Sequence, residues 1–155
     1  MSERRSPSTP LTDAPARRPA AGAAFRPDEA APRFAAPRVM LVEDDFILRA
    51  HLAELLMYEG YTVSCAADGA EALRRLEKEP PPSVILTDII LPRVDGSALR
   101  TVQLQTPALR DIPTIALTSL RDTASLRDLR FAEIMTKPVD IDHLIEVLAK
   151  LCARA

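Results

Sequence analysis

Four short polar stretches of this chain lie where apolar segments end. Glu43-Asp44-Asp45 follow one apolar run, and Asp88 follows another. Thr118-Ser119 and Lys137-Pro138 close two further segments of the same kind. In an open parallel α/β sheet the carboxyl ends of the strands share one crevice, where ligands bind. The sequence therefore predicts one pocket that collects carboxylates, a hydroxyl group and an ammonium group.

This set of groups suits phosphoryl transfer onto a carboxylate. Carboxylates held within about 4 Å repel one another by roughly 4 kcal/mol per pair at an effective dielectric near 20, so the pocket favours a hard cation. Mg²⁺ prefers such oxygen ligands. The Lys137 ammonium and the Thr118 hydroxyl would neutralise charge on a phosphoryl group in transfer. Asp88 would be the nucleophile and would form an aspartyl phosphate.

The elements that must position these residues alternate between strand and helix. Gly60 ends the first helical pattern and Pro80 the second, and the last helix shows apolar residues on one face. Five such repeats predict an α/β fold with a five-stranded parallel sheet covered on both sides. The expected strands are 38–43, 62–66, 83–87, 113–118 and 132–136, and the expected helices are 45–59, 70–79, 97–105, 122–130 and 140–152.

Taken together, these stretches resemble the receiver domain of two-component response regulators, of the single-domain, chemotaxis-receiver-like kind. The resemblance covers residues 38–153 and implies the doubly wound, flavodoxin-like (βα)5 fold. It rests on four segments in this order, which are Val39 to Asp45, Leu86 to Gly96, Leu117 to Ser119 and Thr136 to Pro138.

The resemblance assigns roles to the acidic residues. It implies that Asp44 binds Mg²⁺ directly and that Glu43 acts through water. Asp88 would be both the phosphoacceptor and a metal ligand, and the backbone carbonyl of Ile90 would complete the protein side of the shell, with its side chain facing the catalytic mouth. Asp45 is interpreted instead as the cap of the first helix, where its charge suits the helix dipole.

The remaining site residues form the expected switch. The resemblance implies a cis bond between Lys137 and Pro138 that aims the ammonium into the pocket, and it places Thr118 and Ser119 in the responding segment. The chain departs from the family at Ile134, where receivers usually carry Tyr or Phe. The segment before Lys137 is also short, which predicts a truncated or irregular fourth helix and a readout through altered order or packing.

The function expected from this resemblance is that of a stand-alone receiver, because the chain ends at Ala155 soon after the last helix. The expected phosphodonor is a histidine kinase or a histidine phosphotransfer protein. Output would be docking to another protein or a role as phosphate shuttle or sink, with homodimerisation through the face of the fourth helix, fifth strand and last helix. No enzymatic activity is expected beyond self-catalysed transfer and slow autodephosphorylation, with Ile90 and Leu120 shielding the acyl phosphate.

Two other classes of function stay open. A phosphorylation-independent binding module, or pseudo-receiver, is favoured by Ile134 and opposed by the intact acids, hydroxyl and lysine. A Mg²⁺-dependent phosphohydrolase would need an acid two residues after the nucleophile, and the chain has Ile90 there.

Residues 1–37 differ in composition from the receiver range 38–155. They are rich in Pro, Ala and Arg and lack hydrophobic periodicity, which predicts a disordered N-terminal arm. The arm has no aromatic interleaving, so nucleic-acid binding is not expected. Cys65 and Cys152 are interpreted as free thiols. No apolar run reaches the length of a membrane span, and we expect a cytoplasmic protein without membrane contact.

Overall fold

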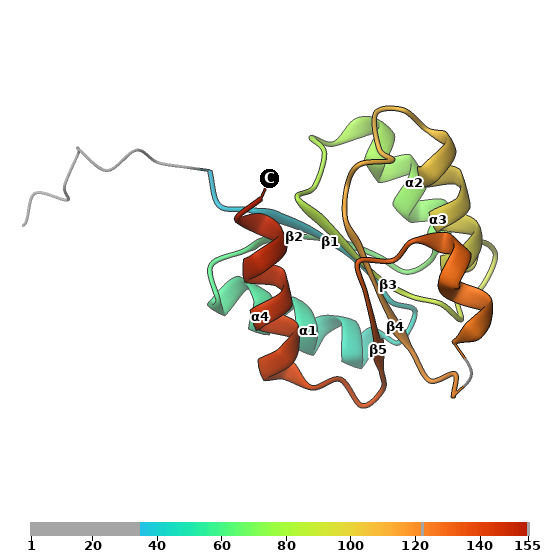
Figure 1. The fold of residues 1–155 in the computed structure, drawn as a ribbon. Coiled ribbons are helices and arrows are strands. Elements are labelled where there is room, and N and C mark those ends of the chain that lie inside the picture. Colours follow the sequence, from blue (N-terminus) through green and yellow to red (C-terminus); the bar gives the residue numbers. More distant parts are fainter. Residues whose placement is uncertain (1–34, 122, 155) are drawn as a thin grey trace, which may run out of the picture. The chain divides into compact units, whose positions relative to one another are not determined.

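The computed structural model describes residues 35–121 and 123–154. The predicted arm 1–37 lies outside these residues, except for its last three positions. Within the described part the chain forms one sheet of five parallel strands in the order β2-β1-β3-β4-β5 (Figure 1). The strands are β1 (Arg38–Val42), β2 (Thr62–Ala66), β3 (Val84–Asp88), β4 (Thr114–Thr118) and β5 (Glu133–Thr136).

The central strands are apolar because both faces of the sheet are covered. All five residues of β3 and all five of β4 are buried. Parallel sheets of this kind read as nearly continuous apolar runs, since neither face meets water. The apolar runs from which these strands were predicted therefore form the interior of the fold. The bounds of each predicted strand differ from the observed bounds by no more than one or two residues.

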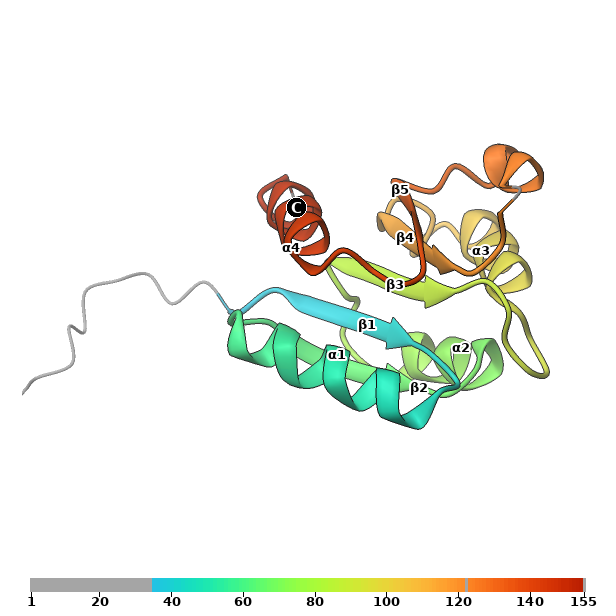
Figure 2. The same cartoon turned by 90° about the horizontal axis from the view of Figure 1, so that it is seen from below.

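The helices are divided between the two faces (Figures 1 and 2). On one face, Leu56 of α1 (Phe46–Tyr58) and Leu148 of α4 (Ile141–Cys152) pack in a core with Leu41. On the other face, Leu76 of α2 (Gly69–Lys78) and Leu99 of α3 (Gly96–Gln105) pack in a second core. The doubly wound α/β fold expected from the sequence is confirmed.

Aspartate caps all four α-helices in the described part of the chain. The side chains of Asp45, Asp68, Asp95 and Asp140 each accept a hydrogen bond from a backbone N–H in the first turn of the following helix. Such caps satisfy donors that have no partner within the helix. The interpretation of Asp45 as a cap is confirmed. Helix α2 begins at Gly69, one residue earlier than predicted, because Asp68 caps it.

The fourth helical segment is a short 3-10 helix, η1 (Ala124–Leu129), as the shortened spacing before Lys137 predicted. It ends at Arg130, which has a left-handed backbone with φ 49°. Leu126 packs with Ile89 and Ala116 in a small apolar cluster over the carboxyl half of β4. This arrangement keeps the connection between β4 and β5 compact without a full α-helix.

In the described range, no helix combines the length and the apolar character that a membrane span requires. Cys65 in β2 and Cys152 in α4 are free thiols and are half-buried. Burial raises the pKa of both thiols. Both side chains pack against the core beneath α1 and α4, and they act as small apolar residues there.

We predict that Asp68→Ala lowers the free energy of unfolding by about 1–2 kcal/mol, since the cap of α2 is lost. The backbone N–H of Glu71 and the Arg93 guanidinium hold the pKa of Asp68 below its ordinary value. This stabilisation is therefore present above the ordinary carboxyl pKa of about 3.9 and is lost as the pH falls through the lower pKa of the folded state.

Urea unfolding at about pH 6 and about pH 3 measures this difference, which should shrink at the lower pH. Asp111→Ala is the matched control, because that side chain is 92% exposed and lies 3.8 Å from Arg110. An exposed pair of this kind contributes little. Equal losses in the two variants, or a loss for Asp68→Ala that does not change with pH, would contradict the assignment.

Candidate phosphoacceptor and metal site

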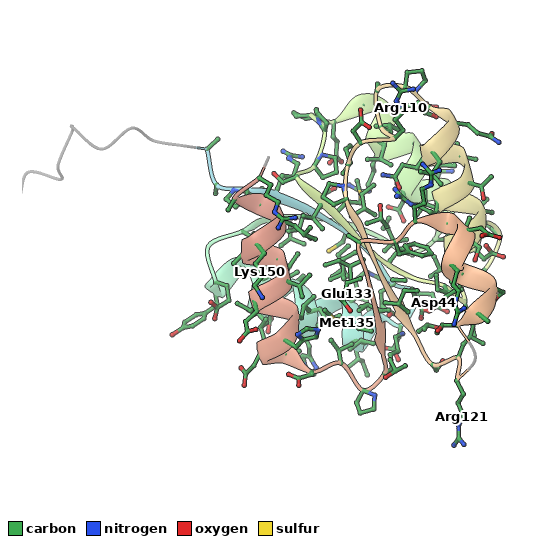
Figure 3. The ribbon with its side chains drawn as sticks, in the orientation of Figure 1. Asp44, Arg110, Arg121, Glu133, Met135 and Lys150 are labelled. Carbon is green, nitrogen blue, oxygen red and sulfur yellow. The ribbon has the colours of Figure 1, made fainter. Side chains whose placement is uncertain are left out.

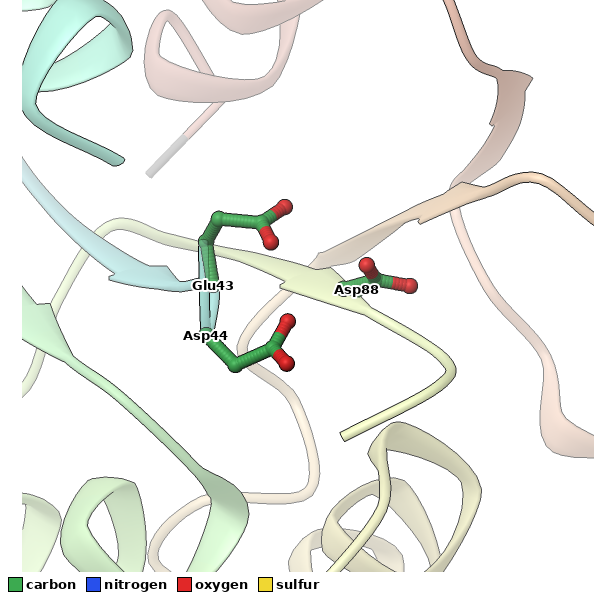
Figure 4. Close-up of side chains that lie close together, drawn as sticks. All are labelled: Glu43, Asp44 and Asp88. Carbon is green, nitrogen blue, oxygen red and sulfur yellow. The ribbon is translucent and has the colours of Figure 1, made fainter. Parts of the chain in front are cut away.

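Three carboxylates meet at the carboxyl ends of two neighbouring strands. Val42 of β1 pairs with Thr87 of β3, so the chain leaves the two strands side by side at Glu43 and Asp88. Glu43, Asp44 and Asp88 each offer a carboxylate oxygen, and these oxygens lie within 4.8 Å of one another (Figure 4). Glu43 and Asp88 are buried, and Asp44 is exposed at the mouth. The structure thus brings together the acids that the sequence singled out.

One ammonium group bridges two of these acids. Lys137 Nζ lies 2.7 Å from Glu43 Oε2 and 2.5 Å from Asp88 Oδ2. Burial acts to lower the pKa of Lys137, but its hydrogen bonds to Asp88 and Glu43 outweigh that effect and raise it. Burial raises the pKa of Glu43, against the opposing effect of Lys137. The lysine is therefore protonated in the pocket and holds the two carboxylates together.

Thr118 lies between the acidic strands and the lysine. It is the last residue of β4 and is fully buried. Its hydroxyl oxygen accepts a hydrogen bond from Leu120 N–H at 3.0 Å, and its carbonyl accepts one from Lys137 N–H at 2.8 Å. The neighbouring Ser119 is exposed. The strand thus ends on a hydroxyl group beside the lysine backbone, as the sequence predicted for Thr118.

The loop after Asp88 is shaped by backbone contacts. Ile90 N–H donates a hydrogen bond to Asp88 Oδ1 at 3.0 Å, while the Ile90 side chain is 55% exposed. Gly96 N–H donates to Ile89 O, and a Cβ added at Gly96 would collide with the Asp88 carbonyl oxygen. Gly96 is therefore required for the close return of the chain that starts α3 beside the end of β3.

The two remaining switch positions lie near the end of β5. The bond between Lys137 and Pro138 is cis, as the resemblance implied. Ile134 is half-buried and packs against the cluster formed by Ile89, Ala116 and Leu126. An aliphatic side chain thus fills the position that carries an aromatic ring in most receivers, and it belongs to the apolar packing under η1.

Sequence reasoning missed an arginine that supports the acidic pair. Arg49 Nη1 donates to the carbonyl of Glu43 at 2.5 Å and to that of Asp44 at 3.4 Å. Its guanidinium also lies 5.7 Å from the centre of the Phe46 ring. Nothing in the helical pattern of residues 45–59 distinguishes Arg49 from a solvated arginine, because its acceptors are backbone atoms.

A second missed contact fixes the loop after Asp88 from the other side. Arg93 has a left-handed backbone with φ 62°, and its guanidinium pairs with the buried carboxylate of Asp68. Gly69 N–H donates to Val94 O at 3.0 Å, and a Cβ at Gly69 would lie 2.6 Å from that oxygen. The start of α2 therefore holds the loop that carries Ile90.

The donor set fits Mg²⁺. The clustered groups are hard carboxylate oxygens, which Mg²⁺ prefers, and the exposed Asp44 leaves an approach for a hydrated ion. The formal negative charge of the three carboxylates is larger than the positive charge of the single ammonium among them. Arg121, which follows β4, points away from the domain and does not offset the difference (Figure 3). A divalent cation would balance this charge.

Comparison with known proteins shows the family to which this chain is similar. The family model described as the response regulator receiver domain matches residues 39–149. A response regulator of Mycobacterium ulcerans, MprA, is 32% identical over 121 residues, which are 76% of this chain and 50% of that protein. The chain spans about half the length of the curated relatives it matches.

Two solved structures extend the similarity to the fold. The signal receiver domain of a histidine kinase from Syntrophus aciditrophicus is 32% identical with a TM-score of 0.71, covering 77% of this chain and 92% of that one. The receiver domain of sensor histidine kinase PA1611 from Pseudomonas aeruginosa is 27% identical with a TM-score of 0.70, covering 77% and 99%. That second structure has a magnesium ion coordinated in its active-site cleft.

We predict that Lys137→Ala tightens Mg²⁺ binding, because it removes the ammonium that competes with the ion for Glu43 and Asp88. A unit charge near 4 Å in a hydrated pocket is worth about 1 kcal/mol, or roughly a fivefold lower dissociation constant. Isothermal titration calorimetry measures this constant. Lys150→Ala, which changes an exposed lysine of α4 (Figure 3), is the control and should bind as the wild type does. Weaker binding in Lys137→Ala would contradict the assignment.

Proposed function

The chain belongs to the response regulator receiver family, and from this membership we propose that Asp88 accepts a phosphoryl group from a histidine kinase or a histidine phosphotransfer protein. One observation carries the proposal. The buried Asp88 carboxylate ends β3 beside two further acids and lies 2.5 Å from the Lys137 ammonium. This is the only such cluster of acids among the residues that the structure describes.

The proposed transfer is a displacement at phosphorus. A carboxylate oxygen of Asp88 forms the new P–O bond as the P–N bond to the donor histidine breaks, and the imidazole nitrogen keeps the electron pair. Lys137 then moves from Asp88 Oδ2 toward the phosphoryl oxygens, where its charge stabilises the product. Thr118 donates its hydroxyl hydrogen to the same group and so reports the phosphorylated state to the segment that follows β4.

The residues that would hold Mg²⁺ are Asp44 and Asp88, with Glu43 acting through water and with the carbonyl of Ile90. The ion, when bound, would neutralise charge on the phosphoryl group. Arg49 and the contact between Gly69 and Val94 hold the backbone of these ligands in place before the ion arrives. Such preorganisation reduces the cost of assembling the site.

The proposed output is docking of this domain to another protein, or passage of the phosphoryl group along a relay. In this role the domain receives its phosphoryl group in the cytoplasm, where ATP-dependent kinases operate, and it has no enzymatic activity on other substrates. Self-association through the face of η1, β5 and α4 stays a prediction. A phosphorylation-independent binding role is the second candidate, and the observation that favours it is the aliphatic packing of Ile134.

The phosphodonor surface is proposed at the start of α1. Phe46 and Ile47 are 71% and 66% exposed directly after the acidic pair, and Ile90 is 55% exposed after Asp88. These apolar side chains lie beside the acidic residues, two in the first turn of α1 and one in the loop after β3. A partner that delivers a phosphoryl group to Asp88 must cover this mouth, so burying the exposed apolar side chains would stabilise the complex.

Intact mass spectrometry after incubation with acetyl phosphate and Mg²⁺ tests the phosphoacceptor. The wild type should gain the mass of one phosphoryl group, and Asp88→Asn should gain none because the amide is not a nucleophile. A histidine kinase should give the same pattern. If neither donor modifies the wild type, the phosphorylation-independent role is favoured. Modification of both chains would place the acceptor elsewhere.

The phosphorylated domain should lose its phosphoryl group slowly, because Ile90 and Leu120 place aliphatic side chains two positions after Asp88 and Thr118. We expect Ile90→Asn to shorten the lifetime severalfold, since a polar side chain can orient an attacking water. The measurement is the decay of phosphoprotein after the donor is removed, with Val102→Asn on the exposed side of α3 as the control. A wild-type lifetime of seconds would refute this shielding.

Docking is tested by Phe46→Ala. Truncating one aromatic anchor should reduce transfer from a phosphorylated histidine kinase about tenfold and leave the rate with acetyl phosphate unchanged. Tyr58→Ala is the control, because Tyr58 is 90% exposed at the far end of the same helix. Parallel losses with both donors would mean that Phe46 supports the site itself rather than the contact with the kinase.

A further inference from the structure

Arg100 of α3 is a buried arginine that has no acidic partner among the residues that the structure describes. It is 4% exposed, and no ion pair joins it to any carboxylate in residues 35–121 or 123–154. Burial lowers its pKa. A buried charge is costly unless hydrogen bonds replace its water. The contacts that compensate Arg100 therefore show what the side chain does.

The acceptors of Arg100 lie on two segments that flank β5. Its Nε donates to Leu129 O at 2.9 Å and its Nη2 donates to Arg130 O at 2.8 Å, at the carboxyl end of η1. Its Nη1 donates to Thr114 Oγ1 at 3.1 Å, at the first residue of β4. Carbonyls at the end of a helix lack partners and carry partial negative charge, which a cation satisfies. Figure 2 shows the orange η1 segment beside α3.

The same network is closed by a second buried polar residue of α3. Gln103 is fully buried, its Oε1 accepts the Thr114 hydroxyl at 2.8 Å, and its Nε2 donates to Ile112 O at 2.8 Å. Arg100 also lies 5.9 Å from the ring centre of Phe131. One face of α3 thus fixes both the start of β4 and the turn that leads into β5.

That turn determines where β5 begins. Ala132 N–H donates to Thr114 O at 2.8 Å, and from there the pairing runs in register to Thr118 and Thr136. The next bond is from Lys137 N–H to Thr118 O at 2.8 Å. Among the residues that the structure describes, β5 is an edge strand of four residues that pairs with β4 alone. A shift of one residue would turn every side chain of β5 to the opposite face.

We propose that Arg100 is a positioning residue for Lys137. By holding the carbonyls of Leu129 and Arg130 against Thr114, it sets the register of β5, and that register delivers the Lys137 ammonium to Glu43 and Asp88. Arg100 acts at a distance, because the four residues of β5 span about 13 Å. The inference deepens the proposed function, since it rests on the role of Lys137 in phosphoryl transfer.

Only arginine suits this position. Its planar fork presents five N–H donors in fixed directions, and its three nitrogens here reach four acceptors on two segments, with Ile112 O at 3.4 Å from Nη1 as the fourth. A lysine carries a single ammonium on a flexible stem and would satisfy only part of the set. Arg100→Lys should therefore give a partial defect, and Arg100→Gln a larger one.

The test compares Arg100→Gln and Arg100→Lys with Arg127→Gln, a control on the exposed side of η1. Amide hydrogen exchange measured by NMR reports how β5 is held in the sheet, independently of phosphoryl transfer. The amides of Ala132 and Lys137 should exchange at least about tenfold faster in Arg100→Gln, while the amide of Leu41 in the core strand β1 keeps its wild-type rate. Phosphorylation by acetyl phosphate should slow about tenfold.

A double-mutant cycle separates positioning from general destabilisation. In a Lys137→Ala background, Arg100→Gln should change the phosphorylation rate by less than about twofold, because the residue through which it acts is gone. The inference would be overturned if Arg100→Gln slowed phosphorylation as much in the Lys137→Ala background as in the wild type. It would also be overturned if the amides of Ala132 and Lys137 exchanged at the wild-type rate in Arg100→Gln. If Arg100→Gln does not fold, Arg100→Lys is judged by the same criteria.

The two proposals fail separately. If the wild type gains no phosphoryl group, the proposed function fails, and hydrogen exchange at Lys137 still decides whether Arg100 sets the position of the lysine. If the wild type is phosphorylated but the Arg100 variants exchange and react as it does, the proposed function stands and the positioning role is refuted.

Discussion

Lys137 carries the ammonium on which the arrangement of the acidic pocket depends. It lies 2.7 Å from Glu43 and 2.5 Å from Asp88, and both carboxylates are buried. Two buried carboxylates this close repel each other when both are charged, and the ammonium between them offsets that repulsion. The proposed phosphoryl transfer to Asp88 would therefore have to break part of the interaction that holds the pocket together.

The topology of the sheet makes this interaction available. The order β2-β1-β3-β4-β5 places β1 beside β3, so the acids meet directly, whereas Lys137 must reach over β4 from the end of β5. From β5 to β3 the distance is two strand spacings, or about 9.6 Å, so Lys137 needs its long side chain to reach Asp88. Thr118 lies on the intervening strand, where its backbone binds Lys137. A phosphoryl group that draws the ammonium would therefore act on β4 and β5 together.

Features that depend on local sequence could be predicted. The strands follow apolar runs, Asp45 caps the helix that follows it, and the acids, hydroxyl and lysine all stand at strand ends. The shortened spacing between Thr118 and Lys137 likewise predicted the reduced fourth helix. Each of these features can be predicted from a few neighbouring residues, together with the rule that parallel strands end at one edge of the sheet.

The remaining features depend on contacts between segments far apart in the sequence. Lys137 meets its partners across 94 and 49 residues. In the sequence, Arg100 looks like any arginine of a helix. In the structure it is buried, and carbonyls about 30 residues away accept its hydrogen bonds. Arg49 also binds carbonyls. No residue type in the sequence marks a carbonyl as an acceptor for a side chain, so these contacts required the structure.

A crystal structure of the domain with Mg²⁺ and beryllofluoride, which mimics a phosphoryl group on Asp88, tests the central role of Lys137 most directly. We predict that Lys137 Nζ leaves Asp88 Oδ2 and binds a fluoride, and that the Thr118 hydroxyl turns to the same group. A structure in which beryllofluoride sits on Asp88 while Lys137 keeps both carboxylates would contradict it.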